Sequence, residues 1–266
     1  MFKREINYRS KDEYLVKTIF FGGGTPSIID SKYIVEILSE INNAYIVDKN
    51  AEITIEINPG TIDKYKLEKY KEAGINRISI GLQSSKEKLL KEIGRIHTYE
   101  DFENTVELAK NVGFTNINVD IMIGIPDQTI YDVEDTLDKV LALDLTHISV
   151  YSLIYEDGTL MTKMVDEGKL LEVDEEIERY MYWYAKRRLE DNGFIHYEIS
   201  NFAKPSYRCK HNLDCWNQKE YLGFGVAAAS YIDNFRIKNT DSLEKYISNI
   251  DSDKYYKNLT IEEKQD

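Results

Sequence analysis

The sequence predicts an α/β protein: a (β/α) barrel followed by a smaller α+β region. Apolar stretches alternate with amphipathic helical stretches through residues 17–154, and glycines punctuate the connections, which is typical of a parallel sheet. The predicted strands also alternate between polar and apolar side chains, as residues 52–58 (EITIEIN) do. A strand between two helix layers should be apolar on both faces. The alternation therefore favours a barrel with a polar lumen, wide enough for a ligand, over an open sheet.

The elements follow one another in a regular order. Strands are expected at residues 17–21, 52–58, 77–83, 116–123 and 147–154. Helices are expected between them at residues 31–42, 62–73, 86–93, 99–112 and 131–143, from apolar side chains at helical spacing and from glycines at helix ends. Met1–Ile6 resembles the end of a helix, a charged helix is expected at residues 174–192, and one strand is expected at residues 196–203.

Composition and charge exclude several classes of function. The 34 basic and 47 acidic side chains give a formal charge of −13, which argues against nucleic acid or an anionic membrane as the main partner. No stretch has transmembrane length, and none near Met1 reads as a signal peptide. The only cysteines are Cys209 and Cys215, so the chain is not a disulfide-rich secreted protein, and a cytoplasmic location is expected.

A glycine turn follows the first predicted strand, in the stretch TIFFGGGTPS at residues 18–27. Glycine allows the backbone to approach a ligand closely and to point N–H groups at it. Such turns are common after strands, so this one alone is weak support for a ligand site.

Reactive polar groups occur late in the next strands: Glu56, Gln83 and Asp120, with Arg95 in a following loop. In parallel barrels these strand ends form the mouth of the active site. Carboxylates suit an ammonium group or ribose hydroxyls, and an arginine suits a carboxylate, so the set fits a ligand with an amino acid end and a ribose end. The alternative is a hydrated barrel lining without a ligand.

A series of motifs resembles the radical S-adenosylmethionine (SAM) proteins of the oxygen-independent coproporphyrinogen III oxidase family, and most closely their HemW-type heme-chaperone branch. The motifs run in order from about residue 17 to residue 231: TIFFGGGTPS, EITIEINPGT, GINRISIGLQS, IGRIH, GFTNINVDIMIGIPDQT, HISVYSLIYEDGT, YEISNFAKP, CKHNLDCW and YLGFGVAAAS. Each motif alone is unspecific, whereas the ordered set is highly specific.

The resemblance implies particular ligand residues. SAM would be bound by Gly23, Gly24, Thr25, Glu56, Gln83, Arg95, Asp120 and Ile154. Heme would be bound in the H-N-x-x-x-W motif, which falls on His211, Asn212 and Trp216, and a histidine nitrogen is a normal heme iron ligand. The alternative for His211 is a hydrogen-bonded histidine in a loop.

One family feature is missing. Relatives carry CxxxCxxC after the first barrel strand, where three thiolates hold a [4Fe–4S] cluster that supplies the electron for SAM cleavage. No cysteine precedes Cys209 here, so no metal site is expected in this chain and the cluster is expected only in an intact form. We expect a fragment that lacks the first strand of the TIM-type barrel and the end of the family's helical domain. A natural cluster-free paralogue is the alternative.

The resemblance also implies a domain organisation. Residues 1–160 would form the partial radical SAM barrel, residues 161–237 a coproporphyrinogen-oxidase-like or heme-chaperone region, and residues 238–266 a polar tail without an obvious core, where a truncated helical domain begins.

Three functions are compatible with these motifs. The first is a heme chaperone that binds heme and passes it to an unidentified acceptor protein. The second is an oxygen-independent coproporphyrinogen III oxidase, which decarboxylates its substrate to protoporphyrinogen IX. The third is an unrelated barrel enzyme that binds a substrate phosphate on Gly22–Gly24, which gives no role to Glu56.

Overall fold

A computed structural model of the chain describes residues 1–10 and 14–264. The α-helices are α1 (Phe2–Arg9), α2 (Ser31–Ala44), α3 (Lys64–Glu72), α4 (Glu87–Glu92), α5 (Tyr99–Val112), α6 (Ile130–Leu141), α7 (Leu160–Asp166), α8 (Glu175–Asp191), α9 (Lys210–Trp216) and α10 (Leu243–Asp251). The strands are β1 (Leu15–Phe21), β2 (Ile46–Ile57), β3 (Arg77–Gln83), β4 (Asn116–Ile123), β5 (His147–Ser152), β6 (Ile195–His196), β7 (Asn201–Ala203), β8 (Ala229–Ile232), β9 (Phe235–Asn239) and β10 (Leu259–Lys264).

The larger sheet has seven strands in the order β1-β2-β3-β4-β5-β7-β6. Strands β2 to β5 pair in parallel, whereas β7 is antiparallel to both β5 and β6. The sheet is curled into a half-barrel, which confirms the predicted partial barrel, and a small antiparallel sheet of β8, β9 and β10 accompanies it. Since β2 to β5 are parallel, their carboxyl ends lie at one edge of this sheet.

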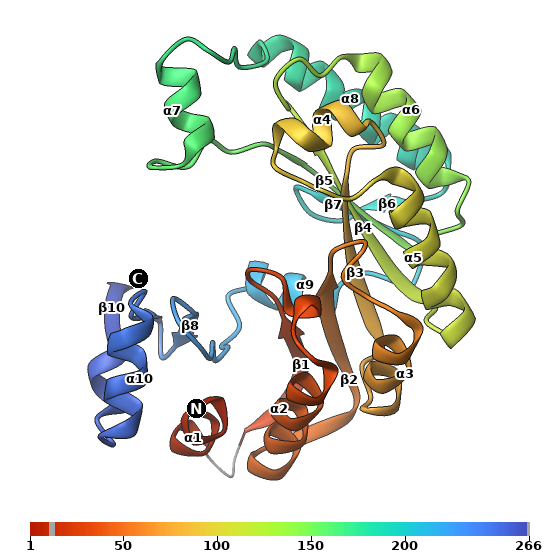
Figure 1. Cartoon of the computed structure of the whole chain (residues 1–266). Helices are drawn as coiled ribbons and strands as arrows, with labels where there is room; N and C mark the ends of the chain where they lie inside the picture. Colours follow the sequence, from red (N-terminus) through yellow and green to blue (C-terminus); the bar gives the residue numbers. More distant parts are fainter. Residues whose placement is uncertain (11–13, 265–266) are drawn as a thin grey trace. The chain divides into compact units, whose positions relative to one another are not determined.

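Local sequence explains why α5 forms and packs against the sheet (Figure 1). Helix α5 begins at a capping box, in which Thr98 and Asp101 exchange side-chain and backbone hydrogen bonds, and it ends at Gly113 with φ 96°. Its stripe of Phe102, Val106 and Ala109 is buried. Apolar residues at this spacing form one helix face, which covers the outer side of β3.

The structure differs from the sequence expectation in several places. Residues 196–203 form two short strands, β6 and β7, rather than one, because residues 197–200 turn the chain back antiparallel. Helix α7 was not expected. Residues 238–266 were expected to lack a core, but Tyr246, Ile250 and Tyr255 are each 3% exposed and pack with Val226 and Leu259, so this expectation is wrong for the described part of the tail.

The chain forms two compact units. The first contains residues 1–19, 32–52 and 209–266, and the second contains residues 20–31 and 53–208. The domain boundaries at residues 160 and 237 stay a prediction.

In the first unit, the buried carboxylate of Glu5 holds helix α1 in place by hydrogen bonds to other segments of that unit. Glu5 is 1% exposed. It accepts hydrogen bonds from the backbone N–H of Gly225 (2.9 Å), from Asn239 Nδ2 (2.9 Å) and from the hydroxyl of Tyr246. A buried carboxylate is stable only with such donors, so this cluster connects α1 to β9 and α10.

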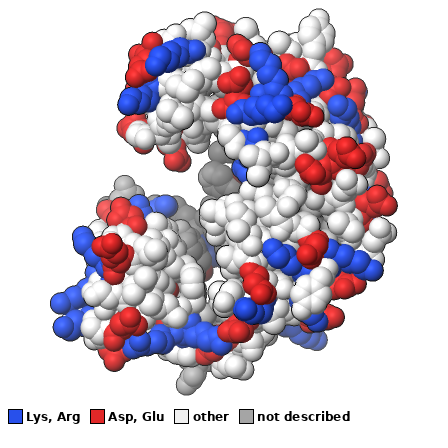
Figure 2. Space-filling model, in the orientation of Figure 1, with Lys and Arg blue, Asp and Glu red and all other residues white. Residues whose placement is uncertain are grey.

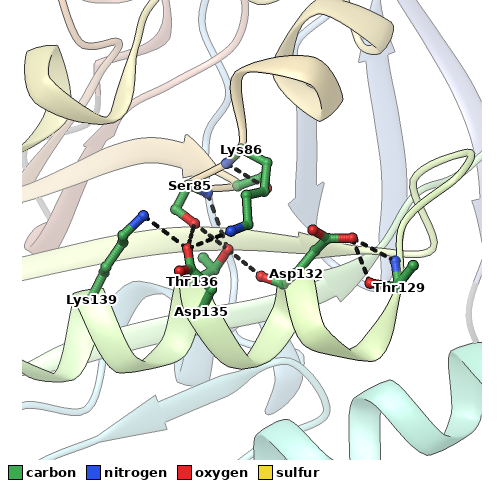
Figure 3. Close-up of polar contacts among 8 residues, drawn as sticks. Ser85, Lys86, Thr129, Asp132, Asp135, Thr136 and Lys139 are labelled. Atoms are coloured by element: carbon green, nitrogen blue, oxygen red, sulfur yellow. Dashed lines mark hydrogen bonds and ion pairs between the residues drawn. The ribbon is translucent and has the colours of Figure 1, made fainter.

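In the second unit, Asp135 of α6 joins that helix to the loop after β3 (Figure 3). Its carboxylate contacts Ser85 Oγ (2.6 Å), Lys86 Nζ (3.1 Å) and Lys139 Nζ (2.9 Å). Burial alone would raise the pKa of Asp135, but the hydrogen bonds from Lys139, Ser85 and Lys86 outweigh it and hold the pKa below its usual range.

On the face shown in Figure 2, acidic and basic side chains are interspersed. Among residues 1–10 and 14–264, no helix combines the length and apolar character needed to cross a bilayer.

We predict that Asp135→Asn lowers the free energy of unfolding by about 1–2 kcal/mol at pH 7, since a neutral amide cannot accept three hydrogen bonds that involve two cations. The folded pKa is depressed. The contribution of Asp135 is therefore fully present above its unfolded pKa of about 3.9 and is lost as pH falls through the folded value.

Urea unfolding at pH 7 and at decreasing pH measures this effect. The matched control is Asp127→Asn, because Asp127 is largely exposed and forms one ion pair, with Lys88. A loss no larger than that of the control would contradict the importance of the Asp135 contacts.

Candidate functional site

A pocket of about 130 Å³ lies at the carboxyl ends of β2 to β5, within the second unit. Six residues predicted from the sequence line it: Gly24, Thr25, Glu56, Gln83, Arg95 and Asp120. We call it the strand-end pocket. Its volume is below the ~300–1,000 Å³ of typical ligand pockets, so it accommodates one end of a cofactor-sized molecule.

Two other predicted residues lie differently. Gly23 belongs to the same turn and contacts the pocket residue Glu56. Ile154 follows β5, is 78% exposed and is not part of the pocket lining. The structure therefore brings seven of the eight predicted side chains or backbone groups together and leaves Ile154 outside.

The glycine turn requires glycine for two reasons. Gly23 and Gly24 have φ values of 79° and 59°, in the left-handed region that glycine adopts easily. A Cβ atom on Gly22 would lie 2.7 Å from the ring of Phe20 and 3.2 Å from Cδ of Glu56, which is too close. The backbone N–H of Gly23 donates to Glu56 Oε2 at 3.1 Å. The turn can therefore present N–H donors, one of which a carboxylate already uses.

Side chains from the next loop hold the turn in place. Asn58 Nδ2 donates to Thr25 Oγ1 at 3.0 Å, and the hydroxyls of Ser27 and Thr61 lie 2.6 Å apart. Lys66 Nζ donates to the backbone carbonyl of Ser27 at 2.7 Å. These contacts tie Thr25 and its neighbours to the end of β2.

Two carboxyl groups, those of Glu56 and Asp120, line the strand-end pocket, and burial disfavours the charged form of both. Burial raises the pKa of Glu56, the nearby Asp120 raises it further, and the Gly23 N–H and Arg77 oppose this. Burial also raises the pKa of Asp120, against the hydrogen bonds of Asn118, Ser149 and Ser79 and the charge of Arg77. Closely placed carboxylates that resist ionisation are suited to binding a cationic or hydroxyl-bearing group.

Gln83 ends β3 in a strained conformation, with φ 65°. Its Nε2 donates to the hydroxyl of Tyr151 at 3.1 Å, while its Oε1 is buried without a hydrogen-bond partner among the described residues. An unpaired buried acceptor costs about 1–3 kcal/mol, so this atom is ready to accept from a ligand donor.

Lining or neighbouring residues outside the predicted set include Arg77, Asn58 and Tyr151. Strand parity points to each of them, because Asn58 shares a face with Glu56. In the same way, Arg77 shares a face with Gln83, and Tyr151 with Ser149. Burial and the neighbouring Asp120 raise the pKa of Tyr151, so its hydroxyl stays neutral.

The residues predicted for heme lie on α9, in the first unit. Glu52, only 5% exposed, accepts from the backbone N–H groups of Lys210 and His211, both at 3.1 Å, and so fixes the start of this helix. His211 Nδ1 lies 3.0 Å from Thr18 Oγ1, and His211 Nε2 lies 3.9 Å from Cys215 Sγ.

Asn212 and Trp216 are one helical turn apart on α9, and Trp216 is 57% exposed. Histidine ligands of metals usually have their second ring nitrogen held by another group. Thr18 holds Nδ1 of His211 in this structure.

The family model of the radical SAM superfamily matches residues 1–140. The chain belongs to the radical SAM superfamily. Within it, the sequence is similar to heme chaperones of the HemW type. The heme chaperone HemW of Bacillus subtilis (strain 168) is 39% identical over 233 residues, and the match covers 87% of this chain and 62% of that relative. HemW of Escherichia coli (strain K12) is 36% identical over 217 residues, which cover 80% of this chain and 55% of that relative.

This radical SAM chain thus spans between 55% and 62% of the length of these two curated relatives. Among solved structures, the coproporphyrinogen III oxidase HemN from Escherichia coli, a radical SAM enzyme, is similar over 100% of this chain and 64% of its own, with a TM-score of 0.84 and 22% identity. The archaeal Elp3 of Methanocaldococcus infernus gives a TM-score of 0.53 at 21% identity, over 64% of this chain and 44% of its own. Because both structures are less than 25% identical to this chain, their similarity shows a shared fold and nothing about function.

Radical SAM proteins imply two cofactors, SAM and a [4Fe–4S] cluster, and the residues present fit them unequally. The glycine turn, the paired carboxylates and the unpaired Gln83 Oε1 fit the polar ends of SAM. The cluster does not fit this chain. Its sequence holds two cysteines, and the described residues contain no group of three His, Cys, Asp or Glu side chains placed for a metal ion. Three thiolates at least are needed.

We predict that Glu56→Gln raises the melting temperature by roughly 2–4 °C at pH 7, about 1 kcal/mol for a chain of this length, because it removes a desolvated charge beside Asp120. The folded pKa of Glu56 is raised. The gain in melting temperature from Glu56→Gln is therefore complete above that folded pKa, and it is absent below the unfolded pKa of about 4.3.

Thermal melts between pH 4 and pH 8 test this expectation. Glu68→Gln on α3 is the control, because the Glu68 side chain is 46% exposed and forms an i,i+4 pair with Lys64. A lower melting temperature for Glu56→Gln than for wild type at pH 7 would contradict the electrostatic description of the pocket.

Proposed function

We propose that this chain is the SAM-binding and heme-binding part of a heme chaperone, which binds heme and passes it to an acceptor protein. The relatives named above as heme chaperones lead to this proposal. The observation that carries it is the strand-end pocket, in which Gly24, Thr25, Glu56, Gln83 and Asp120 converge. A cytoplasmic location is part of the proposal, because the sequence holds two cysteines and they form no disulfide.

The proposed SAM contacts follow from charge and hydrogen bonding. The amino group of SAM would approach Glu56, and its carboxylate would approach the N–H groups at Gly23 and Gly24 together with the guanidinium of Arg95. Asp120 and Gln83 Oε1 would accept from hydroxyl groups of the ligand. When a [4Fe–4S] cluster is present in a longer protein, it supplies the electron for radical chemistry, and the residues here bind and orient SAM.

The proposed heme ligand is His211 rather than Cys215, its neighbour on α9. Partial burial and the adjacent Asp214 raise the pKa of Cys215, so its thiol stays protonated at neutral pH and is a poor iron ligand. Thr18 at Nδ1 of His211 and the exposed ring of Trp216 would complete a surface on which a flat macrocycle can lie.

We predict that His211→Ala lowers heme affinity at least tenfold and abolishes the Soret band of a histidine-ligated heme, because the axial nitrogen is lost. Heme titration followed by absorbance measures both. Cys215→Ser is the matched control one helical turn away, and it should retain the wild-type spectrum. Unchanged affinity and spectrum in His211→Ala would remove the assignment of His211.

We also predict that the 266-residue chain binds SAM without cleaving it, since its sequence lacks the cysteines of the cluster. Calorimetry should detect binding that weakens at least tenfold in Asp120→Asn, because the amide cannot offer two charged acceptors. After incubation with iron, sulfide and dithionite, chromatography should detect no methionine or 5′-deoxyadenosine. Formation of either product would overturn the prediction.

The second candidate function is coproporphyrinogen III oxidase, which the similarity in fold to HemN favours. Product analysis distinguishes the two in a protein that includes the cluster-binding segment. With SAM, a reductant and coproporphyrinogen III, the chaperone should form no protoporphyrinogen IX. Repeated turnover to that product would favour the oxidase.

A further inference from the structure

A row of hydrogen bonds runs beneath the strand-end pocket and joins three sequence motifs. It begins at Tyr197, in the turn between β6 and β7, whose hydroxyl lies 2.7 Å from His147 Nε2. His147 Nδ1 lies 2.5 Å from Asn118 Oδ1, and Asn118 Nδ2 lies 2.8 Å from Asp120 Oδ1. The NINVD, HISVY and YEISN motifs thus meet at one line of contacts, within the second unit.

The register of the sheet produces this juxtaposition. Asn118 pairs with His147 across β4 and β5, and Asp120 pairs with Ser149. Side chains at these positions point to the inner face, because residues two apart on a strand share a face. His147 is fully buried and Asn118 is 2% exposed, so neither can exchange its partners for water.

The surroundings fix which way the Asn118 amide points. Its Nδ2 faces Asp120 Oδ1 and, at 2.7 Å, Ser79 Oγ, whose own hydroxyl donates to Asp120 Oδ2 at 3.3 Å. The opposite orientation would place the amide oxygen against a carboxylate, which repels it. The amide oxygen therefore has to point toward His147 and Ser149.

That orientation in turn fixes the tautomer of His147. Because Asn118 Oδ1 can only accept, Nδ1 of His147 must carry the proton and donate it. The other ring nitrogen then accepts from the Tyr197 hydroxyl. Burial and the charge of Arg77 lower the pKa of His147 well below its usual value, so the ring stays neutral with this single tautomer.

We propose that His147 is a positioning residue of the pocket: its Nδ1–H locks the Asn118 amide so that the NH₂ group faces the carboxylate of Asp120. The effect of this network on ligand binding rests on the proposed SAM-binding function, whereas the hydrogen bonds themselves form without a ligand. His147 does not contact the pocket and acts only through Asn118.

A matched pair of variants separates positioning from packing. Asparagine and leucine have nearly the same shape, and both remove the ring and its contact with Tyr197. In His147→Asn an NH₂ group can still donate to Asn118 from the position of Nδ1, whereas His147→Leu has no donor there. A purely structural role predicts equal effects of the two.

The first measurement is SAM affinity by calorimetry between pH 5 and pH 8. We expect His147→Asn to stay within about twofold of wild type. In His147→Leu the Asn118 amide keeps its contacts with Ser79 and Asp120 but loses the donor at Oδ1. It is then held less firmly against Asp120, so the pKa of Asp120 rises and the fall of affinity at low pH moves to higher pH. The loss near neutral pH should be about tenfold, as for one hydrogen bond to a charged group. Glu56, Arg77, Arg95 and Tyr151 also face Asp120, and they are unchanged in both variants.

The second measurement does not depend on SAM. Long-range ¹H–¹⁵N correlation spectra of the wild-type chain should show His147 as the neutral Nδ1–H tautomer from pH 5 to pH 8, with the signal assigned by its loss in His147→Asn. Carboxyl ¹³C titration should give Asp120 a higher pKa in His147→Leu than in His147→Asn.

The outcomes separate the two proposals. An Nε2–H tautomer, or equal Asp120 titration in the two variants, overturns the positioning role even if SAM binds. A wild-type chain that does not bind SAM overturns the proposed SAM site, while the carboxyl titration still decides the role of His147.

Discussion

The structure depends on one constraint: the inner face of a parallel sheet is polar and mostly closed to water, so its groups must satisfy one another. Strands β2 to β5 place Glu56, Ser79, Asp120 and Ser149 on that face. Each unpaired buried polar group costs about 1–3 kcal/mol, which explains why these side chains form continuous hydrogen bonds. The exceptions among the described residues include Arg77 Nε and Gln83 Oε1, and the latter lies at the pocket.

Much of this face was predictable because strand geometry is regular. The expected strands at residues 77–83 and 116–123 coincide with β3 and β4. The alternation of side chains along the strands points to Glu56, Gln83 and Asp120 independently of any family likeness. The backbone conformation of Gln83 was not predictable, because a positive φ at a glutamine depends on the tertiary surroundings rather than on local propensity.

Contacts between segments that are far apart in the chain could not be predicted from the sequence. Glu52 holds the start of α9 although 157 residues separate it from Cys209, and nothing local to Glu52 indicates this. The core of residues 246–259 was missed because its buried residues are mainly tyrosines, whose hydroxyls make a core segment look polar. The tyrosines Tyr246 and Tyr255 place these hydroxyls on Glu5 and Asn239, which supplies the partners that burial requires.

The hydrogen bond between Gly23 and Glu56 has a consequence for selectivity. A ligand anion that takes over the Gly23 N–H displaces the Glu56 carboxylate and leaves it without that donor. A zwitterion replaces the lost bond with its own ammonium group, so the exchange conserves hydrogen bonds and charge pairing. An inorganic phosphate offers no such replacement and adds a second negative charge beside Glu56. If the turn binds a ligand as proposed, it would therefore discriminate by the overall charge pattern of the incoming group, even though its backbone donors would accept any anion.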